Sequence, residues 1–367
     1  MFDNPTGNRT LAVLALAIGA LTPLTHAQQY LQTNLVADQS GVAAATDPNL
    51  VNPWGLSRSS TSPWWAADNG TGLSTLYDGT GAAKSLVVTI PTGDPNMSST
   101  GTPSGTVFNS STGFVLPNGK PAAFMFVTED GTISGWNGGA SAVITVNTKS
   151  ASVFKGATLA TLPIPFGSQS TFLYVADFRK GRVQVYDSAF HHIQGIEDFF
   201  RDERLPRGYA PFNIQNIGGE LYVTFAKQDA EKHDEVDGAG LGYVDVFSPF
   251  GFLLHRMEHG WWLNGPWGLA MAPGDFGIYS HDLLVGQFGS GNVAVYDPVT
   301  GAFKDLLRDA NNKPIAISGL WGLSFGSGTP TGSGPANTLY FAAGSDGEQH
   351  GLFGTLTPIQ NTLGNGQ

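Results

Sequence analysis

The 367-residue sequence contains no cysteine. This absence excludes a disulfide framework, a cysteine nucleophile and cysteine-ligated metal sites, so the hydrophobic core must stabilise the fold alone. A chain of this length can do so, because it buries about three quarters of the surface that its unfolded form exposes.

Basic residues are scarce as well. The chain has 18 Lys and Arg against 29 Asp and Glu, which gives a formal net charge of −11. An acidic chain is repelled by phosphate backbones and anionic membrane surfaces, so we expect neither nucleic acid nor a membrane as a partner. A small molecule or an extracellular polymer remains as the expected ligand.

Long apolar runs are missing, apart from a short one near the start. Residues 11–21 are apolar or small, follow Arg9 and precede Thr25-His26-Ala27. A bilayer-spanning helix needs about 20 such residues, whereas a charged segment, a short apolar segment and small residues in this order are typical of a cleavable signal peptide. We therefore expect residues 1–27 to be removed, residues 28–367 to form one domain without a membrane anchor, and the mature protein to be secreted or periplasmic.

Helical periodicity is absent from the rest of the chain, while turn-forming residues are abundant. The 49 glycines and 22 prolines, with only 13% charged residues, indicate many short strands joined by tight turns. The sequence thus predicts an all-β fold.

A five-residue motif repeats along the chain. Asn52-Pro53-Trp54-Gly55-Leu56 recurs as Gly265-Pro266-Trp267-Gly268-Leu269 and as Gly319-Leu320-Trp321-Gly322-Leu323. With Phe108 and Phe212 taken as its equivalents, and one more unit near residues 154–162, the chain divides into six units of roughly 50–55 residues.

A second landmark keeps the same phase. Tyr77, Tyr186 and Tyr296 each end a strand-like segment, at intervals of 109 and 110 residues, or two units each. A pair of β-sandwich domains would explain the strands but not this period. We predict a six-bladed β-propeller with four strands per blade, in which residues 30–36 pair beside residues 352–356 and close the ring.

The repeated motif, together with Thr128-Glu129-Asp130-Gly131-Thr132-Ile133 and Glu348-Gln349-His350-Gly351-Leu352-Phe353-Gly354, resembles an uncharacterised family of exported bacterial propellers. Many members end in a PEP-CTERM sorting segment that this sequence lacks, which favours free release. The chain is more distantly similar to NHL-repeat and gluconolactonase-like propellers, which include scaffolds, metal-dependent lactonases and a lyase. The resemblance implies the fold and no particular activity.

In such a fold, the loops between second and third strands and those between blades share one face, at the mouth of the central channel, where ligands usually bind. Seven polar residues are our candidates for a ligand site there: Asn52, Asp68, Glu129, Asp177, Asn264, Gln287 and His350. Of these, Glu129 and Asp177 could ligate a hard divalent cation such as Ca²⁺. Alternatively, Asp and Asn occupy these turns because they bond the local backbone.

The chemistry therefore stays open. The first hypothesis is a propeller that binds an unidentified ligand at the channel mouth. The alternatives are a metal-assisted hydrolase or lyase, favoured by converging carboxylates, and a passive extracellular scaffold, favoured by a channel filled with apolar side chains. No catalytic residue is assigned.

Two of three further segments allow more than one interpretation. The acidic insert at residues 227–242 is either a functional, cation-binding loop or an inert one, and Arg201, Arg204 and Arg207 either neutralise an anionic ligand or pair with acidic neighbours. Residues 91–105, rich in Pro, Gly, Ser and Thr, are expected to form a flexible excursion.

One motif is expected to be a coincidence. His255-Arg256-Met257-Glu258-His259 spells the zinc motif H-x-x-E-H, which requires a helix. We expect an outer strand here, which separates the two histidines by about 13 Å and rules out a shared zinc.

Overall fold

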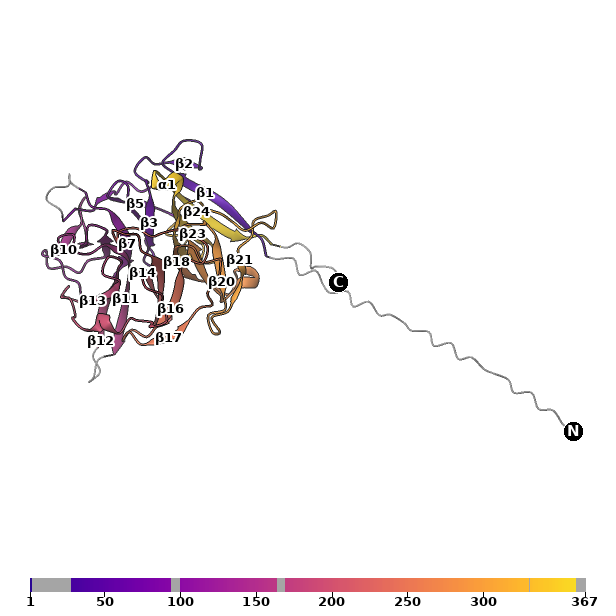
Figure 1. Cartoon of the computed structure of the whole chain (residues 1–367). Helices are drawn as coiled ribbons and strands as arrows, with labels where there is room; N and C mark the ends of the chain where they lie inside the picture. Colours follow the sequence, from indigo (N-terminus) through magenta and orange to yellow (C-terminus); the bar gives the residue numbers. More distant parts are fainter. Residues whose placement is uncertain (2–27, 94–99, 164–168, 330, 361–367) are drawn as a thin grey trace.

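The computed structural model describes residue 1 and residues 28–93, 100–163, 169–329 and 331–360. The predicted signal peptide, apart from its first residue, and residues 94–99 of the expected excursion lie outside the described residues. Six sheets form a ring, which confirms the all-β, six-bladed β-propeller (Figure 1).

The strands follow the predicted order, from the channel outward in each blade. Blades one to three consist of β3 (Pro53–Ser57), β4 (Trp64–Asp68), β5 (Leu73–Tyr77) and β6 (Val88–Thr89); β7 (Pro103–Phe108), β8 (Phe124–Thr128), β9 (Thr132–Trp136) and β10 (Val143–Asn147); and β11 (Phe154–Pro163), β12 (Gln169–Asp177) and β13 (Arg182–Tyr186). Blades four and five consist of β14 (Tyr209–Ile217), β15 (Glu220–Lys227), β16 (Tyr243–Phe247) and β17 (Leu253–Arg256); and β18 (Pro266–Met271), β19 (Leu283–Gln287), β20 (Val293–Tyr296) and β21 (Phe303–Leu306).

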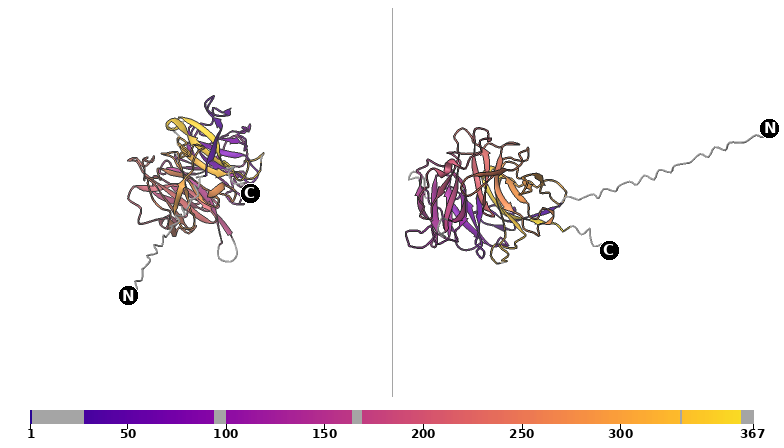
Figure 2. Two further views of the ribbon diagram at one scale, coloured as in Figure 1. Left: turned by 90° about the vertical axis from the view of Figure 1, so that its right-hand side faces the viewer. Right: turned by 90° about the horizontal axis from the view of Figure 1, so that it is seen from below.

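Blade six closes the ring with both ends of the chain. It contains β22 (Leu320–Phe325), β23 (Leu339–Gly344) and β24 (His350–Pro358), followed outward by β1 (Tyr30–Ala37) and β2 (Ala45–Thr46). β1 pairs antiparallel with β24, from Tyr30 opposite Pro358 to Ala37 opposite Leu352, as predicted. The outer edge of β24 is thereby paired. Figure 2 shows the blades gathered into one body.

The inner strands β3, β7, β11, β14, β18 and β22 contact one another in a closed circle. In all six, the register with the second strand shifts near the start of the strand, after the first residue in five of them and after the third in β14, which marks a β-bulge. Glycine is required at this point in most blades, because a Cβ on Gly55 would lie 2.7 Å from the carbonyl oxygen of Ser104 in the next blade.

This common bulge corrects the predicted start of the second unit and confirms the third unit near residues 154–162. The second unit begins with Pro103-Ser104-Gly105, and Phe108 lies at the far end of β7. The third begins with Phe154-Lys155-Gly156. The expected excursion therefore ends before Pro103, because residues 103–105 form an inner strand packed against blade three. The residues equivalent to Trp54 are Ser104, Lys155, Phe212, Trp267 and Trp321.

Blade three differs from the predicted four strands. Within the described residues it has three, and its fourth position is reduced to one bridge between Tyr186 and His192 and a bond from Ile193 N to the carbonyl of Val185 (2.8 Å). The chain then leaves the sheet toward the 3-10 turn η1 (Ile196–Asp198).

The core lies between the blades. The second landmark, Tyr77, Tyr186 and Tyr296, is buried there, and Trp65 stacks on Phe124 of the next blade with ring centres 4.1 Å apart. The H-x-x-E-H segment begins in the outer strand β17, as expected. In the described part of the chain, no helix is long and apolar enough to cross a membrane.

Candidate ligand site at the channel mouth

Aromatic rings close the channel at the end where the inner strands begin. Trp54 stacks on Trp321 with ring centres 3.7 Å apart, and Trp267 meets both edge-on at 6.3 and 5.9 Å. These three side chains and Phe212 are almost completely buried. We call the four residues the aromatic plug, because their rings pack against one another where the inner strands begin.

Lys155 holds the position of Trp54 in blade three, beside the plug. Its side chain is fully buried, and its ammonium lies 4.8 Å from the ring centre of Trp54 and 5.9 Å from that of Phe212. A cation can sit against aromatic faces in this way, but a buried charge also needs an opposite charge.

Two carboxylates supply that charge. The Nζ of Lys155 lies 2.5 Å from Oε1 of Glu129 in blade two and 3.3 Å from Oδ1 of Asp234 in blade four. Desolvation alone would lower the pKa of Lys155, but attraction to Glu129, Glu235 and Asp234 raises it above its ordinary value. Lys155 is therefore a permanent cation in the wall of the site.

Hydrogen bonds extend this group to blades one and six. Asn69 Nδ2 donates to Oε2 of Glu129 (2.8 Å), and Asn52 Nδ2 donates to Oε1 of Glu348 (3.0 Å). Asn52 Oδ1 accepts from Nε1 of Trp321 (3.2 Å), which ties the network to the aromatic plug. Asn52 has φ 48°, a left-handed conformation that Asn tolerates better than most residues.

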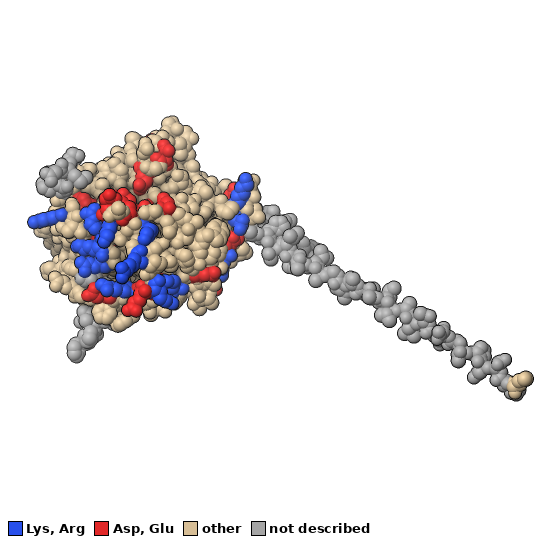
Figure 3. All heavy atoms as spheres, viewed as in Figure 1, with Lys and Arg blue, Asp and Glu red and all other residues tan. Residues whose placement is uncertain are grey.

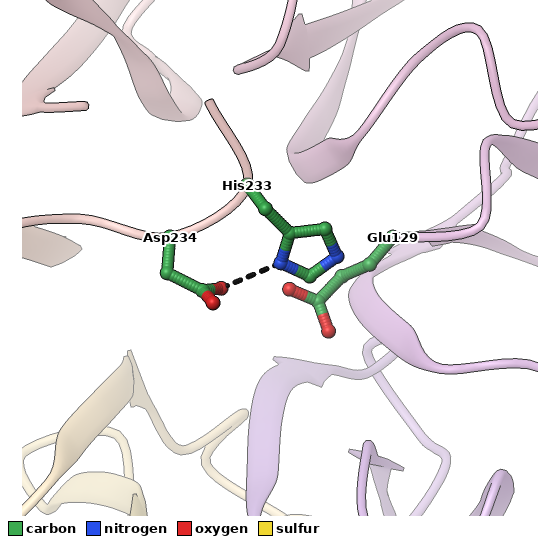
Figure 4. A group of neighbouring side chains, drawn as sticks. All are labelled: Glu129, His233 and Asp234. Carbon is green, nitrogen blue, oxygen red and sulfur yellow. Dashed lines mark hydrogen bonds and ion pairs between the residues drawn. The ribbon is translucent and has the colours of Figure 1, made fainter. Parts of the chain in front are cut away.

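The insert of blade four covers the group from the other side. His233 Nδ1 lies 2.8 Å from Oδ1 of Asp234, and Figure 4 shows both side chains beside Glu129. The bond to His233 and then the charge of Lys155 lower the pKa of Asp234 to about 2, despite its desolvation, and the bond to Asp234 raises the pKa of His233. Among the described residues, these three side chains are the one group of at least three potential metal ligands whose ligand atoms all lie within 4.8 Å of one another.

Carboxyl groups outnumber cations here. Burial raises the pKa of Glu235 to about 8, with further increases from the nearby charges of Asp237 and Glu348, although Lys155 opposes the shift. Desolvation and then Glu129 raise the pKa of Glu348. The group of residues that we call the channel-mouth cluster comprises Asn52, Asn69, Glu129, Lys155, His233, Asp234, Glu235 and Glu348. In Figure 3, acidic side chains gather beside the short helix α1 (Ser345–Glu348), next to basic side chains over β11, β13 and β14.

No family model matches this sequence. The uncharacterized protein R648 of Acanthamoeba polyphaga mimivirus is 30% identical over 338 residues, which cover 89% of this chain and 80% of that protein. This chain belongs to the R648 family. A second mimivirus relative, the uncharacterized protein L690, is 29% identical over 342 residues, or 89% of this chain and 85% of that one.

Solved propellers resemble the R648-family protein more distantly. Virginiamycin B lyase from Staphylococcus aureus has 13% identity and a TM-score of 0.47, over 90% of this chain and all of that one. A streptogramin B lyase has 13% sequence identity and a TM-score of 0.46, and the match covers 90% of this chain and 98% of that one. At this level of similarity, no residue or activity is carried over.

Two of the seven sequence candidates, Asn52 and Glu129, meet in the channel-mouth cluster of this R648-family protein. Asp68 and Asp177 do not join them, since each is bonded within its own blade. Asp68 Oδ2 accepts from the backbone N of Thr75 (2.9 Å), and Asp177 accepts from Gln184 Nε2 (2.5 Å) and the backbone N of Lys180 (3.1 Å).

The other three candidates hold loops in place. Asn264 Oδ1 accepts from the backbone N of Gly238 (2.7 Å) and so anchors the insert, while Gln287 Oε1 accepts from the backbone N of Asn264 (2.9 Å). His350 Nδ1 lies 2.8 Å from Oδ2 of Asp38, where β24 meets β1.

Sequence reasoning missed Lys155, the centre of the cluster. The signal was present, because Phe154-Lys155-Gly156 places a lysine where three other units have Trp before Gly. The acidic insert, which the sequence leaves open as a functional or an inert loop, supplies His233, Asp234 and Glu235 to the cluster. Of the arginines, Arg201 pairs with Asp198 (2.9 Å) and Arg204 with Asp202 (3.3 Å), as the ion-pair alternative expected.

Proposed function

We propose that the channel mouth of this protein binds a positively charged ligand, with the carboxylates of Glu129, Asp234 and Glu348 as its anionic contacts. The observation that carries the proposal is the excess of carboxyl groups around one buried ammonium: Glu129, Asp234, Glu235 and Glu348 lie around Lys155, and Asp237 lies near Glu235. Burial, with a smaller contribution from neighbouring carboxylates, raises the pKa of Glu235 and of Glu348, and a bound cation would offset both effects.

A divalent cation such as Ca²⁺ is the simplest ligand of this kind, because it prefers carboxylate and amide oxygens. Glu129 stays a candidate ligand, as the sequence predicted. Asp177 is not part of this proposal, since its oxygens accept bonds within blade three. Because Lys155 already lies between Glu129 and Asp234, the negative charge without a paired cation falls on Glu348, with Asp237 also close to Glu235.

The test is calorimetric titration with CaCl₂ alone and, separately, with 1,4-diaminobutane, an organic dication. Glu348→Gln keeps the shape of the side chain and removes its charge, so it should weaken binding of the accepted cation about tenfold or more. Asp198→Asn, on the exposed blade connection, is the matched control and should leave binding unchanged. The proposal fails if neither cation binds, or if Glu348→Gln and Asp237→Asn both bind as the unaltered protein does.

A second candidate function is metal-assisted hydrolysis or elimination. It is supported by two adjacent carboxyl groups in opposite states, Asp234 with its lowered pKa and Glu235 with its pKa near 8, the pattern of a base beside an acid. Turnover of a lactone and acidic-oligosaccharide panel that is abolished by Glu235→Gln would support this function. Binding without turnover in any panel member would leave the first proposal and reject the second.

We also propose that the protein acts outside the cytoplasm, as one of the exported propellers that its motifs resemble. The support is the signal-like segment at residues 1–27. Extracellular Ca²⁺ modules work at dissociation constants of about 10⁻⁴–10⁻³ M, which suits a site whose charge is partly neutralised by its own lysine. Cell fractionation of a C-terminally tagged protein tests the location. If no ligand binds at the channel mouth, the remaining hypothesis is a passive scaffold, which the apolar side chains of the aromatic plug favour.

A further inference from the structure

The opposite end of the channel is an open pocket with different chemistry. It has a volume of about 490 Å³ and is lined by the far halves of five inner strands and the residue after β3: Leu56, Ser57, Arg58, Thr106, Val107, Phe108, Ala157, Thr158, Leu159, Gln215, Asn216 and Ser324. We call it the lower pocket. It shares Leu56, Thr106, Ala157 and Gln215 with a cavity of about 30 Å³ that Trp267 of the aromatic plug also lines. The lower pocket is thus the open part of a channel that the plug closes at its other end.

Arg58 is the one charged residue in this lining. Its guanidinium donates from Nε to the carbonyl of Phe325 (2.7 Å) and from Nη2 to that of Gly326 (3.1 Å), and lies 5.5 Å from the ring centre of Trp64. No carboxylate of the described residues lies within ion-pair distance of it, although the chain has a net charge of −11.

The guanidinium therefore has unused binding capacity. An arginine carries five N–H donors, and three of them are directed at backbone carbonyls, the third through a long contact of 3.5 Å to Ser59. Burial without an opposite charge lowers the pKa of Arg58. The two remaining donors suit the paired oxygens of a carboxylate or phosphate group.

A second, independent feature points the same way. Thr106 Oγ1 is buried and has no hydrogen-bond partner in the described structure, and Thr106 lines both the lower pocket and the small cavity above it. Buried hydroxyl groups are normally hydrogen-bonded, so an unpaired one in a pocket wall indicates a missing partner. Ser57, Gln215 and Ser324 add polar groups to the same wall.

We propose that the lower pocket binds a small hydroxylated molecule that carries one oxyanion, a carboxylate or a phosphate, with Arg58 as its anchor. The volume lies in the range of small-molecule sites. The uncompensated guanidinium selects the anion, and the hydroxyl and amide groups of the wall receive the hydroxyl groups of the ligand. This site does not depend on the channel-mouth cluster, because the aromatic plug lies between them.

The test is calorimetric titration with three probes: gluconate, glucose 6-phosphate and the neutral glucitol. We expect one or both anions to bind and glucitol to bind at least tenfold more weakly. The two anions distinguish a carboxylate from a phosphate ligand. Arg58→Gln should weaken binding of the anion at least tenfold. Arg58→Lys keeps the charge but not the paired donors, so its affinity for the anion should fall between those of the unaltered protein and Arg58→Gln.

Two further variants keep the test decisive. Thr106→Val removes the unpaired hydroxyl at nearly constant volume and should weaken binding of the anion several-fold. This variant tests the site even if Arg58→Gln does not fold. Arg308→Gln, whose guanidinium is paired with Asp305 on the surface, is the control and should bind normally. Equal binding of glucitol and the anions, or no loss in the Arg58 and Thr106 variants, would overturn the proposal. Glu348→Gln should leave anion binding intact, which separates this result from the fate of the channel-mouth proposal.

Discussion

The ammonium of Lys155 and the carboxylate of Glu129 face each other at 2.5 Å across the boundary between blades three and two. Neither residue has another formal charge within ion-pair distance on its own blade among the described residues; the second carboxylate at Lys155 comes from Asp234 in blade four. One ion-pair group thus ties three blades together at the rim of the channel.

Removing the cation should be the most damaging single change in this group. Lys155→Met leaves Glu129 buried beside Asp234 without a counter-charge, and breaking a buried pair in this way costs about 3–5 kcal/mol. Urea unfolding at pH 7 measures the loss. Lys155→Met combined with Glu129→Gln should recover part of it, because the uncompensated charge is gone. A double variant less stable than Lys155→Met would contradict this account.

Glu235 should give the protein a distinct dependence on pH. Its pKa is about 8 in the folded state and near 4.5 in an unfolded chain. The folded state therefore holds a proton that the unfolded state loses, so the contribution of Glu235 to stability is full below pH 4.5 and is lost as pH rises toward 8. Denaturation midpoints at pH 5, 7 and 8.5 should decline less in Glu235→Gln than in the unaltered protein, and parallel curves would show that Glu235 does not titrate in this range.

The glycines at the inner bulges should resist substitution. In Gly55→Ala the new methyl group would meet the Ser104 carbonyl oxygen at 2.7 Å and the Thr106 nitrogen at 2.8 Å. Because both are backbone atoms, the strands must separate, at a cost of about 1–3 kcal/mol. Gly274→Ala is the control, since its nearest neighbours are atoms of the His281 ring at 3.2 Å. Thermal unfolding compares the midpoints of Gly55→Ala and Gly274→Ala. Equal midpoints would mean that the inner strands can move apart at little cost.

Deleting residues 28–37 should destabilise the whole ring. The deletion removes β1, exposes the edge of β24, and breaks the bond from Tyr30 to the carbonyl of Phe276 (3.0 Å). We expect a large drop in the thermal midpoint and aggregation through the unpaired edge, measured by calorimetry and light scattering. Tyr30→Phe loses only the hydrogen bond to Phe276 and should lower the free energy of unfolding by about 1 kcal/mol. A stable, monomeric deletion variant would show that β24 does not need its outer partner.

The repeats predicted the fold well because each blade requires the same few residues at the same points. A large aromatic residue and a glycine at the inner bulge, and a tyrosine between blades, are dictated by packing that recurs in most blades, so they appear as a period in the sequence. The repeat is not recognisable where the packing differs. Ser104 and Lys155 stand in place of the aromatic residue in blades two and three, so Phe108 was aligned with Trp54 instead of Ser104.

The site was harder to predict, because residues in similar turns point in different directions. Asp68, Glu129 and Asp177 all end or follow a second strand. The short Asp side chains bond the N–H groups of their own hairpins, whereas the longer Glu129 extends to Lys155. Nothing in the local sequence of Glu129 specifies a partner that lies 26 residues away in another blade, or an insert that lies still further along the chain.

The pairing of β1 with β24 also sets the order in which this protein can be made. Asp38 and His350, whose side chains meet at the end of that pairing, are 312 residues apart. At synthesis rates of 5–20 residues per second, the first strand waits roughly 16–60 s for its partner to exist. The first element to be made is thus among the last to be paired, and no truncated product of a stalled ribosome can close the ring.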